Sequence, residues 1–169
     1  NREQQSVKTG HAALNDIQED YDLFLMAVKE KGEELKSLVE SQQYTAQEIV
    51  KLISKHSRDL YHLHGVTVAY EPYAFDKSIK LFSPFYDKRR GMVRQLESKY
   101  DYTIDSIETN QWYYGPINNP KGFWTEPYLG TDAQMVVVDY GIPFFLKGSR
   151  KPSGVISLTM DLKKLGSKM

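Results

Sequence analysis

The sequence predicts an α+β domain with an antiparallel sheet, and three observations lead to this class. Apolar residues recur at helical spacing in the N-terminal part of the chain, a helix-capping sequence follows, and short β-branched segments separated by turn residues occupy the rest. Two helices followed by strands that are joined through hairpins are typical of α+β domains. At 169 residues the chain has the size of one domain with one core.

The first helix is predicted from apolar residues that recur every three or four positions from Leu14 to Leu38. Lys31 interrupts this stripe once, while Leu25 widens it. A helix packed on its own domain and a dimer seam are therefore both open interpretations. Gly32 costs about 1 kcal/mol relative to Ala inside a helix, so we expect a bend or a close contact there.

A second helix is predicted after the SQQ linker. Thr45 and Glu48 have the spacing of a capping box, and apolar residues continue at helical intervals as far as Leu63. Gly65 is expected to end this helix.

The first strands are predicted beyond that glycine. Residues 66–70, VTVAY, are β-branched and short, and residues 79–82 are the expected hairpin partner. A short helix is expected within residues 92–100.

The C-terminal part of the chain predicts the remaining strands. Residues 135–138 form a continuous apolar strand, and residues 155–160 alternate Val, Ser and Thr with Ile, Leu and Met. Pro143 places the stretch between them at a sheet edge or a bulge, because proline donates no ladder hydrogen bond. The sequence KGSRKPSG is the expected hairpin loop before the last strand.

Composition excludes several classes of function. Lys plus Arg and Asp plus Glu both number 22, so no strong field attracts nucleic acid, and no nucleic-acid partner is expected. The absence of cysteine removes disulfides, thiolate metal sites and cysteine nucleophiles. No stretch has the roughly twenty apolar residues that span a bilayer. No phosphate-binding, dinucleotide-binding or hydrolase motif is present, and we expect no cofactor and no catalysis.

The segment from Asn110 to Tyr128 combines aromatic residues with Gly, Pro and Asn. Aromatic rings on turns are typical of small-molecule pockets, and such loops often carry binding residues. We predict that Trp112, Tyr113, Trp124 and Tyr128 line one cavity.

The chain resembles the extracytoplasmic Cache (PAS-like, PDC) sensor domains of bacterial transmembrane receptors in an ordered set of residues: Trp112-Tyr113, Trp124, Pro127-Tyr128, a Val-rich strand, Ile142-Pro143, Gly154-Val155 and Asp161-Leu162. The resemblance implies a long N-terminal helix packed on a PAS-like antiparallel sheet. It also implies one sensor domain over residues 1–169, with N-terminal helices in 1–63, the sheet and ligand-binding loops in 64–162, and a link to a missing transmembrane helix in 163–169.

The function implied by this resemblance is binding of a small organic ligand, either a carboxylate or an amine, outside the cytoplasm. The domain would belong to an inner-membrane receptor of the histidine kinase, serine phosphatase or chemoreceptor type and face the periplasm. Flanking transmembrane helices would attach it to the membrane. A homodimer is expected in the full receptor, and the isolated chain is expected to be monomeric or a weak dimer because Lys31 interrupts the helix stripe.

The resemblance also implies particular ligand contacts. In the amino-acid-binding branch of these sensors, an Arg two residues before the Trp grips the ligand carboxylate, while a Tyr sixteen residues after the Trp and a later Asp hold the amine. Trp112, Tyr128 and Asp161 match, but Asn110 stands at the Arg position. An amide cannot form the charged bidentate fork of Arg, which argues against α-amino acids. Asp139, at a strand end, is the second carboxylate candidate.

Other interpretations remain open from the sequence. His62 and His64 could share one face of an extended segment, but without cysteine and with the other histidines distant, we expect no metal site. A periplasmic enzyme, a free solute-binding protein and a structural dimerisation module are the alternatives to a sensor.

Overall fold

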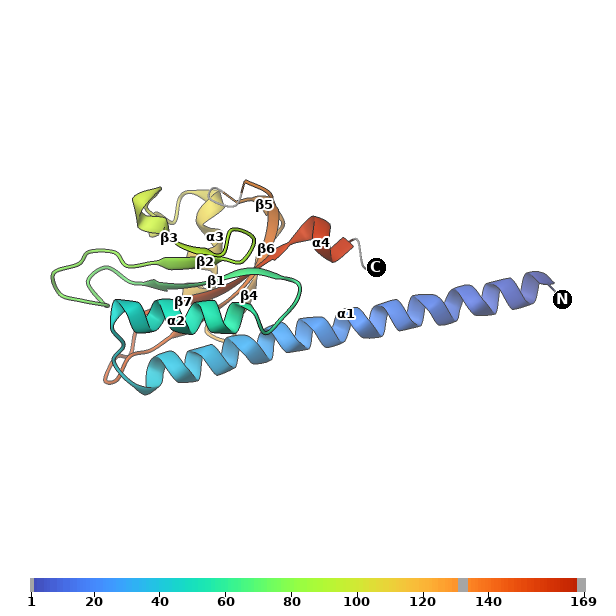
Figure 1. The fold of residues 1–169 in the computed structure, drawn as a ribbon, viewed down its shortest axis with the longest axis horizontal. Coiled ribbons are helices and arrows are strands. Elements are labelled where there is room, and N and C mark those ends of the chain that lie inside the picture. The colour runs from blue at the N-terminus through green and yellow to red at the C-terminus, as the bar shows by residue number, and fades with distance from the viewer. Residues whose placement is uncertain (1, 131–133, 167–169) are drawn as a thin grey trace.

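A computed structural model describes residues 2–130 and 134–166. They form one antiparallel sheet with helices on both of its faces (Figure 1). The strands follow the order β3-β2-β1-β7-β6-β4, and β5 also pairs with β6. The helices are α1 (Arg2–Ser41), α2 (Ala46–Ser57), α3 (Gln111–Asn118) and α4 (Leu162–Gly166), with 3₁₀ turns at Leu96–Ser98 and Glu108–Asn110. The strands are β1 (Leu63–Tyr70), β2 (Pro84–Asp87), β3 (Met92–Gln95), β4 (Phe123–Trp124), β5 (Tyr128–Leu129), β6 (Val136–Phe144) and β7 (Gly154–Asp161).

Helix α1 is longer than its apolar stripe predicts, and its N-terminal part projects well beyond the sheet (Figure 1). Its C-terminal part packs on the sheet through Val28, Leu35 and Val39, which are all buried. Gly32 lies at the predicted close contact, because a Cβ there would stand 3.1 Å from a ring carbon of Tyr140. The helix therefore lies close to the Tyr140 ring of β6 at a position where it has no side chain.

Lys31, which interrupts the stripe, is buried and joins α1 to the end of α2. Its Nζ donates to Glu34 and Asp59 at 2.8 Å each and lies 3.0 Å from Nδ1 of His56. Burial opposes the charge, but the bonds to the two carboxylates outweigh it and raise the pKa of Lys31. Burial and the neighbouring Lys31 lower the pKa of His56, so the imidazole is neutral and can accept the lysine's hydrogen bond.

The predicted capping box begins α2. The Glu48 N–H donates to Thr45 Oγ1 at 3.2 Å, and the Thr45 N–H donates to Glu48 Oε1 at 3.1 Å. The predicted end was wrong, because α2 ends at Ser57, and Leu63 already belongs to β1. Gly65 does not end a helix. A Cβ there would lie 2.1 Å from the Tyr86 carbonyl oxygen, so glycine is needed where the paired strand β2 lies very close to β1.

The hairpin that follows β1 also differs from the prediction. Strand β1 pairs in the ladder with β2 and β7, and residues 79–82 form no strand; only the Tyr70 N–H, at the end of β1, donates to the Phe82 carbonyl at 3.0 Å. The short helix expected within residues 92–100 is wrong at its start, since β3 occupies that part and pairs with β2; only a 3₁₀ turn follows. A tight turn at Gly91, with φ of 64°, joins the two strands.

Strand β6 contains Pro143 within a longer strand than predicted. The Ser153 N–H donates to the Phe144 carbonyl, so residue 144 faces β7 and the Pro143 nitrogen faces the opposite side. On that side the pairing with β4 reaches only Gly141. Pro143 therefore occupies an outer position of the strand, as the edge expectation required.

The three longest strands each present alternate residues to two different layers. In β7, Ile156, Leu158 and Met160 enter the core beneath α1 and α2, which we call the helix-side core. Val155 enters a second core with Trp112 on the opposite face, which we call the α3-side core. The candidate site lies on this second face.

Candidate functional site

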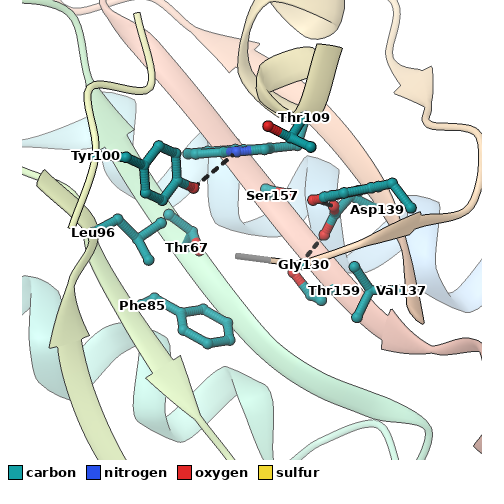
Figure 2. Close-up of a pocket in the computed structure, with 12 residues that line it drawn as sticks. Thr67, Phe85, Leu96, Tyr100, Thr109, Gly130, Val137, Asp139, Ser157 and Thr159 are labelled. Atoms are coloured by element: carbon teal, nitrogen blue, oxygen red, sulfur yellow. Dashed lines mark hydrogen bonds between the residues drawn. The ribbon is translucent and has the colours of Figure 1, made fainter. Parts of the chain in front are cut away.

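A small cavity of about 40 Å³ lies between the sheet and α3, on the α3-side face (Figure 2). Its lining combines hydroxyls, one carboxylate and aromatic rings, from Thr67, Phe85, Leu96, Tyr100, Thr109, Trp112, Tyr128, Gly130, Val137, Asp139, Ser157 and Thr159. At roughly 10–15 Å³ for each water-sized sphere, this space holds about three waters. The cavity therefore suits a small ligand.

Asp139 forms the charged part of this cavity. Its side chain is buried, and the hydroxyls of Tyr128 and Thr159 donate to its two carboxylate oxygens. Its own N–H donates to Thr125 Oγ1 at 2.9 Å, which fixes the backbone. The carboxylate keeps further acceptor capacity, because each oxygen can accept more than one hydrogen bond.

Burial raises the pKa of Asp139 to about 6, although the hydrogen bonds from Thr159 and Tyr128 oppose the rise. The group is therefore an anion above that pH and a neutral acid below it. Burial and the neighbouring Asp139 also raise the pKa of Tyr128 well above its ordinary value, so its hydroxyl remains a donor.

Two hydroxyl residues extend this polar surface across the sheet. Thr67 of β1 and Ser157 of β7 stand opposite each other in the antiparallel register, and both line the cavity. Ser157 is buried, and its hydroxyl makes no hydrogen bond within 3.5 Å among residues 2–130 and 134–166, although it lies near enough to Asp139 to help lower the pKa of that carboxyl. A buried hydroxyl without a partner costs free energy, so this oxygen is available to a ligand.

The aromatic wall comes from α3 and the segment before it. Trp112 Nε1 donates to the Tyr100 hydroxyl at 3.1 Å, and both residues line the cavity. Figure 2 shows the Tyr100 ring beside it. Helix α3 can lie close to the sheet because position 141 is glycine: a Cβ there would stand 2.3 Å from Pro116 Cγ. The tryptophan therefore covers the polar surface of β6 and β7 directly.

The prediction that four aromatic residues line one cavity is wrong for two of them. Trp112 and Tyr128 line it, although Trp112 lies on a helix and not on a turn. Tyr113 packs beside the cavity in the α3-side core, 4.8 Å from the Tyr102 ring. Trp124 pairs with Tyr140 in the ladder, and the rings lie 4.9 Å apart on the helix-side face.

The two aspartates predicted as ligand contacts lie in different places. Asp139 lies in the cavity, whereas Asp161, preferred on the family pattern, lies outside it at the end of β7. Asp161 Oδ1 accepts from the N–H of Lys163 at 3.0 Å and of Lys164 at 3.4 Å, at the beginning of α4. The geometry therefore favours Asp139 as the ligand contact.

Asn110, at the position where the amino-acid pattern has Arg, is buried and bound to backbone. Its Nδ2 donates to the carbonyls of Asp101 and Ile104, both at 3.0 Å. These bonds hold the loop before α3 in place. The amide N–H groups are therefore already used within the domain.

Sequence reasoning missed most of the hydroxyl residues of the cavity, including Thr67, Ser157, Thr159 and Tyr100. A signal was present, since the last strand alternates hydroxyl with apolar side chains and VTVAY places one Thr between valines. Strand alternation puts such hydroxyls on one face.

The histidines and carboxylates of the described residues form no metal site beside this cavity. Within residues 2–130 and 134–166, no group of three His, Asp or Glu side chains is placed to hold a metal ion. His62 packs edge-on against Phe24 at 4.9 Å, and His64 lies buried in β1. Among the helices of that same part of the chain, none is long and apolar enough to cross a bilayer.

Residues 49–167 match a family model described as the first PDC sensor domain of methyl-accepting chemotaxis protein-like receptors. The chain belongs to this PDC sensor family. Its fold, a long N-terminal helix with a seven-stranded antiparallel sheet, is the one expected from the Cache resemblance. No curated protein sequence matches the chain significantly.

Solved structures show the same fold. The extracellular domain of a putative histidine kinase superposes with a TM-score of 0.76 and 19% identity, over 86% of this chain and 56% of that one. A second such kinase domain gives 0.73 and 21%, over 92% and 61%. The sensory domain of the Campylobacter jejuni chemoreceptor Tlp3, with isoleucine bound, gives 0.55 and 15%, over 95% and 58%. This PDC sensor domain thus spans 56 to 61% of the length of these three structures.

Proposed function

We propose that this PDC domain is the extracytoplasmic sensor of a transmembrane receptor and that its α3-side cavity binds a small, positively charged amine. The observation that carries the ligand class is the buried Asp139 carboxylate beneath aromatic rings. Of the described residues that line the cavity, none is Lys, Arg or His. A bound carboxylate would face Asp139 without a balancing cation, whereas an ammonium group would neutralise it.

The walls fit the same ligand class. Trp112, Tyr100 and Phe85 present aromatic surfaces, which attract cations through the ring quadrupole. Ser157 and Thr67 offer hydroxyl oxygens that can accept from an N–H group. A cavity of about 40 Å³ limits the ligand to a few non-hydrogen atoms unless side chains move.

Binding at this position acts on the strand that leaves the domain. Asp139 of β6 stands opposite Thr159 of β7, and β7 continues into α4. A ligand that favours one arrangement of these strands by about 1–3 kcal/mol would shift the receptor between two states. We therefore assign the domain to sensing and not to catalysis, with a histidine kinase, phosphatase or chemotaxis output in the same receptor.

The test uses purified domain and a panel of methylamine, ethanolamine and trimethylamine, compared with acetate and with α-amino acids. We expect amines to raise the melting temperature at pH 7.5, since a ligand at a hundred times its Kd adds about 2.7 kcal/mol to stability. Binding should weaken below pH 6, where Asp139 is protonated.

Matched variants locate the effect. Asp139→Asn should weaken amine binding at least tenfold, whereas Asp161→Asn, which removes a carboxylate outside the cavity, should leave it unchanged. Equal loss in both variants, or tighter binding of acetate than of amines, would contradict the assignment of the ligand class. Homodimer formation remains a prediction, which sedimentation at micromolar concentration tests.

A further inference from the structure

A second hollow lies where β1 begins and β7 ends, and it shares no residue with the α3-side cavity. Its volume is about 250 Å³, and it is lined by Leu63, His64, Lys88, Arg89, Met135, Asp161 and Lys164. Three of these side chains are cationic, in contrast to the α3-side cavity. Its lining residues come from the start of β1, the turn after β2, the residue before β6, the end of β7 and α4, which lie at one end of the sheet. Figure 1 shows α4 at this end.

The cations come from two separate parts of the fold. Lys88 and Arg89 follow β2, and Lys164 lies on α4. Lys88 Nζ donates to the carbonyls of Leu60 at 2.9 Å and Tyr61 at 3.2 Å, which fixes its position. Burial and the positive charge of Lys164 lower the pKa of Lys88, so the two ammonium groups repel each other in this structure.

One carboxylate shares the lining, but it does not cancel the positive charge. Asp161 Oδ1 accepts from the backbone N–H groups of Lys163 and Lys164, at 3.0 and 3.4 Å. Three cations and one carboxylate leave a surplus of positive charge at the hollow. An anion would relieve the repulsion between the cations.

His64 provides an independent indication of a ligand. Its side chain is only 4% exposed and lines the hollow, and its Nε2 has no hydrogen-bond partner in the part of the chain that the structure describes. The nearest acidic oxygen, Asp87 Oδ1, is 3.8 Å away, which is too long for a hydrogen bond. In the tautomer that carries its proton on Nε2, this buried ring nitrogen can donate to a group that enters the hollow.

We propose that this hollow binds a phosphoryl-type anion, held by Lys88, Arg89 and Lys164 with His64 as a further donor. The planar fork of arginine matches two phosphoryl oxygens, and the two lysines act as point charges on the same group. The space is large enough for an attached organic group as well. Because the anion contacts the β2–β3 turn and α4 at once, it holds α4 against the sheet at the exit of the domain.

The experiment titrates the domain with inorganic phosphate and with glycerol 3-phosphate at constant ionic strength, by calorimetry and by NMR of the histidine side chains. The wild-type domain should bind and show shifts at His64. The double variant Arg89→Gln with Lys164→Gln alters exposed side chains and should bind at least tenfold more weakly. The control pair Lys163→Gln with Lys121→Gln removes the same charge outside the hollow and should stay within about twofold of wild type.

Each result of this titration either supports or contradicts the proposed phosphoryl site. Tighter binding of glycerol 3-phosphate assigns the site to a phosphoester, and equal or tighter binding of phosphate assigns it to the free anion; both support the proposal. Absence of binding, binding without shifts at His64, or equal loss in the two double variants overturns it. The result does not depend on whether amines bind beneath α3.

Discussion

The two faces of the sheet are built from the same strands but serve different purposes. On the helix-side face, β7 presents Ile156, Leu158 and Met160, all fully buried beneath α1 and α2. On the α3-side face, the same strand presents Ser157 and Thr159 to a cavity. Strand alternation thus lets one strand contribute to a dry core and to a ligand site at once.

The difference follows from what covers each face. Two long helices fill the helix-side core, and its buried lysine, Lys31, has carboxylate and imidazole partners. The short helix α3 and the loops around it cover the other face. There the strands present hydroxyl groups and the Asp139 carboxylate, whereas on the helix-side face they present apolar side chains. Such polar groups need partners, and Ser157 has none in the described part of the domain, so that face is the one suited to a ligand.

The largest effect is expected from a cavity made on the helix-side face. Leu158→Ala should lower the free energy of unfolding by about 2–5 kcal/mol, because the buried side chain leaves a void. Urea denaturation at neutral pH measures this. The control Leu162→Ala, at a position that is 37% exposed, should change stability by less than about 1 kcal/mol. A similar loss in both variants would contradict the contrast between core and surface.

A pH experiment examines the charge on the α3-side face. The pKa of Asp139 is about 6 in the fold against 3.8 as the ordinary value, so between these values the native state binds more protons than the unfolded state. The free energy of unfolding therefore falls as pH rises from 4 to 6, and roughly 3 kcal/mol corresponds to this pKa difference. Asp139→Asn should lack that fall. The measurement is the difference between wild-type and variant stability from pH 4 to 7, and parallel curves would contradict the raised pKa.

Asn110→Arg tests whether the amino-acid pattern can be restored on this face. From the sequence, arginine would supply the missing carboxylate fork. In the structure, it removes two buried amide hydrogen bonds and adds volume, so we expect a stability loss of about 1–3 kcal/mol and no gain in amino-acid binding. Asn118→Arg, at an exposed position of α3, is the control for the added charge. If calorimetry finds micromolar amino-acid binding by the Asn110→Arg variant, the loop before α3 rearranges to accept the arginine.

The smallest effect on stability is expected one residue away from Leu158. Ser157→Ala removes a buried hydroxyl without a partner, so the free energy of unfolding should be unchanged or rise by up to about 1 kcal/mol. Amine binding should nevertheless weaken, since the ligand loses an acceptor. Denaturation and calorimetry on the same variant check both parts. A loss of stability comparable to that of Leu158→Ala would show that the hydroxyl has a structural role.

The sequence alone determined the types of most elements and the family. These elements depend on local geometry, which is set by residues that are close in the sequence. Examples are the apolar spacing from Leu14 to Leu38, the capping box at Thr45 and the alternation in residues 155–160. The order of aromatic and strand residues was sufficient to identify a Cache-like domain.

Only the tertiary structure decided which candidates share the cavity. Trp124 faces the helices because its register pairs it with Tyr140, and Asp139 enters the cavity because β6 places it opposite Thr159. Register is set by contacts between distant segments, so spacing along the chain cannot reveal it. The close approach of α3 over Gly141 then closes the cavity above Asp139, a position that no local pattern specifies.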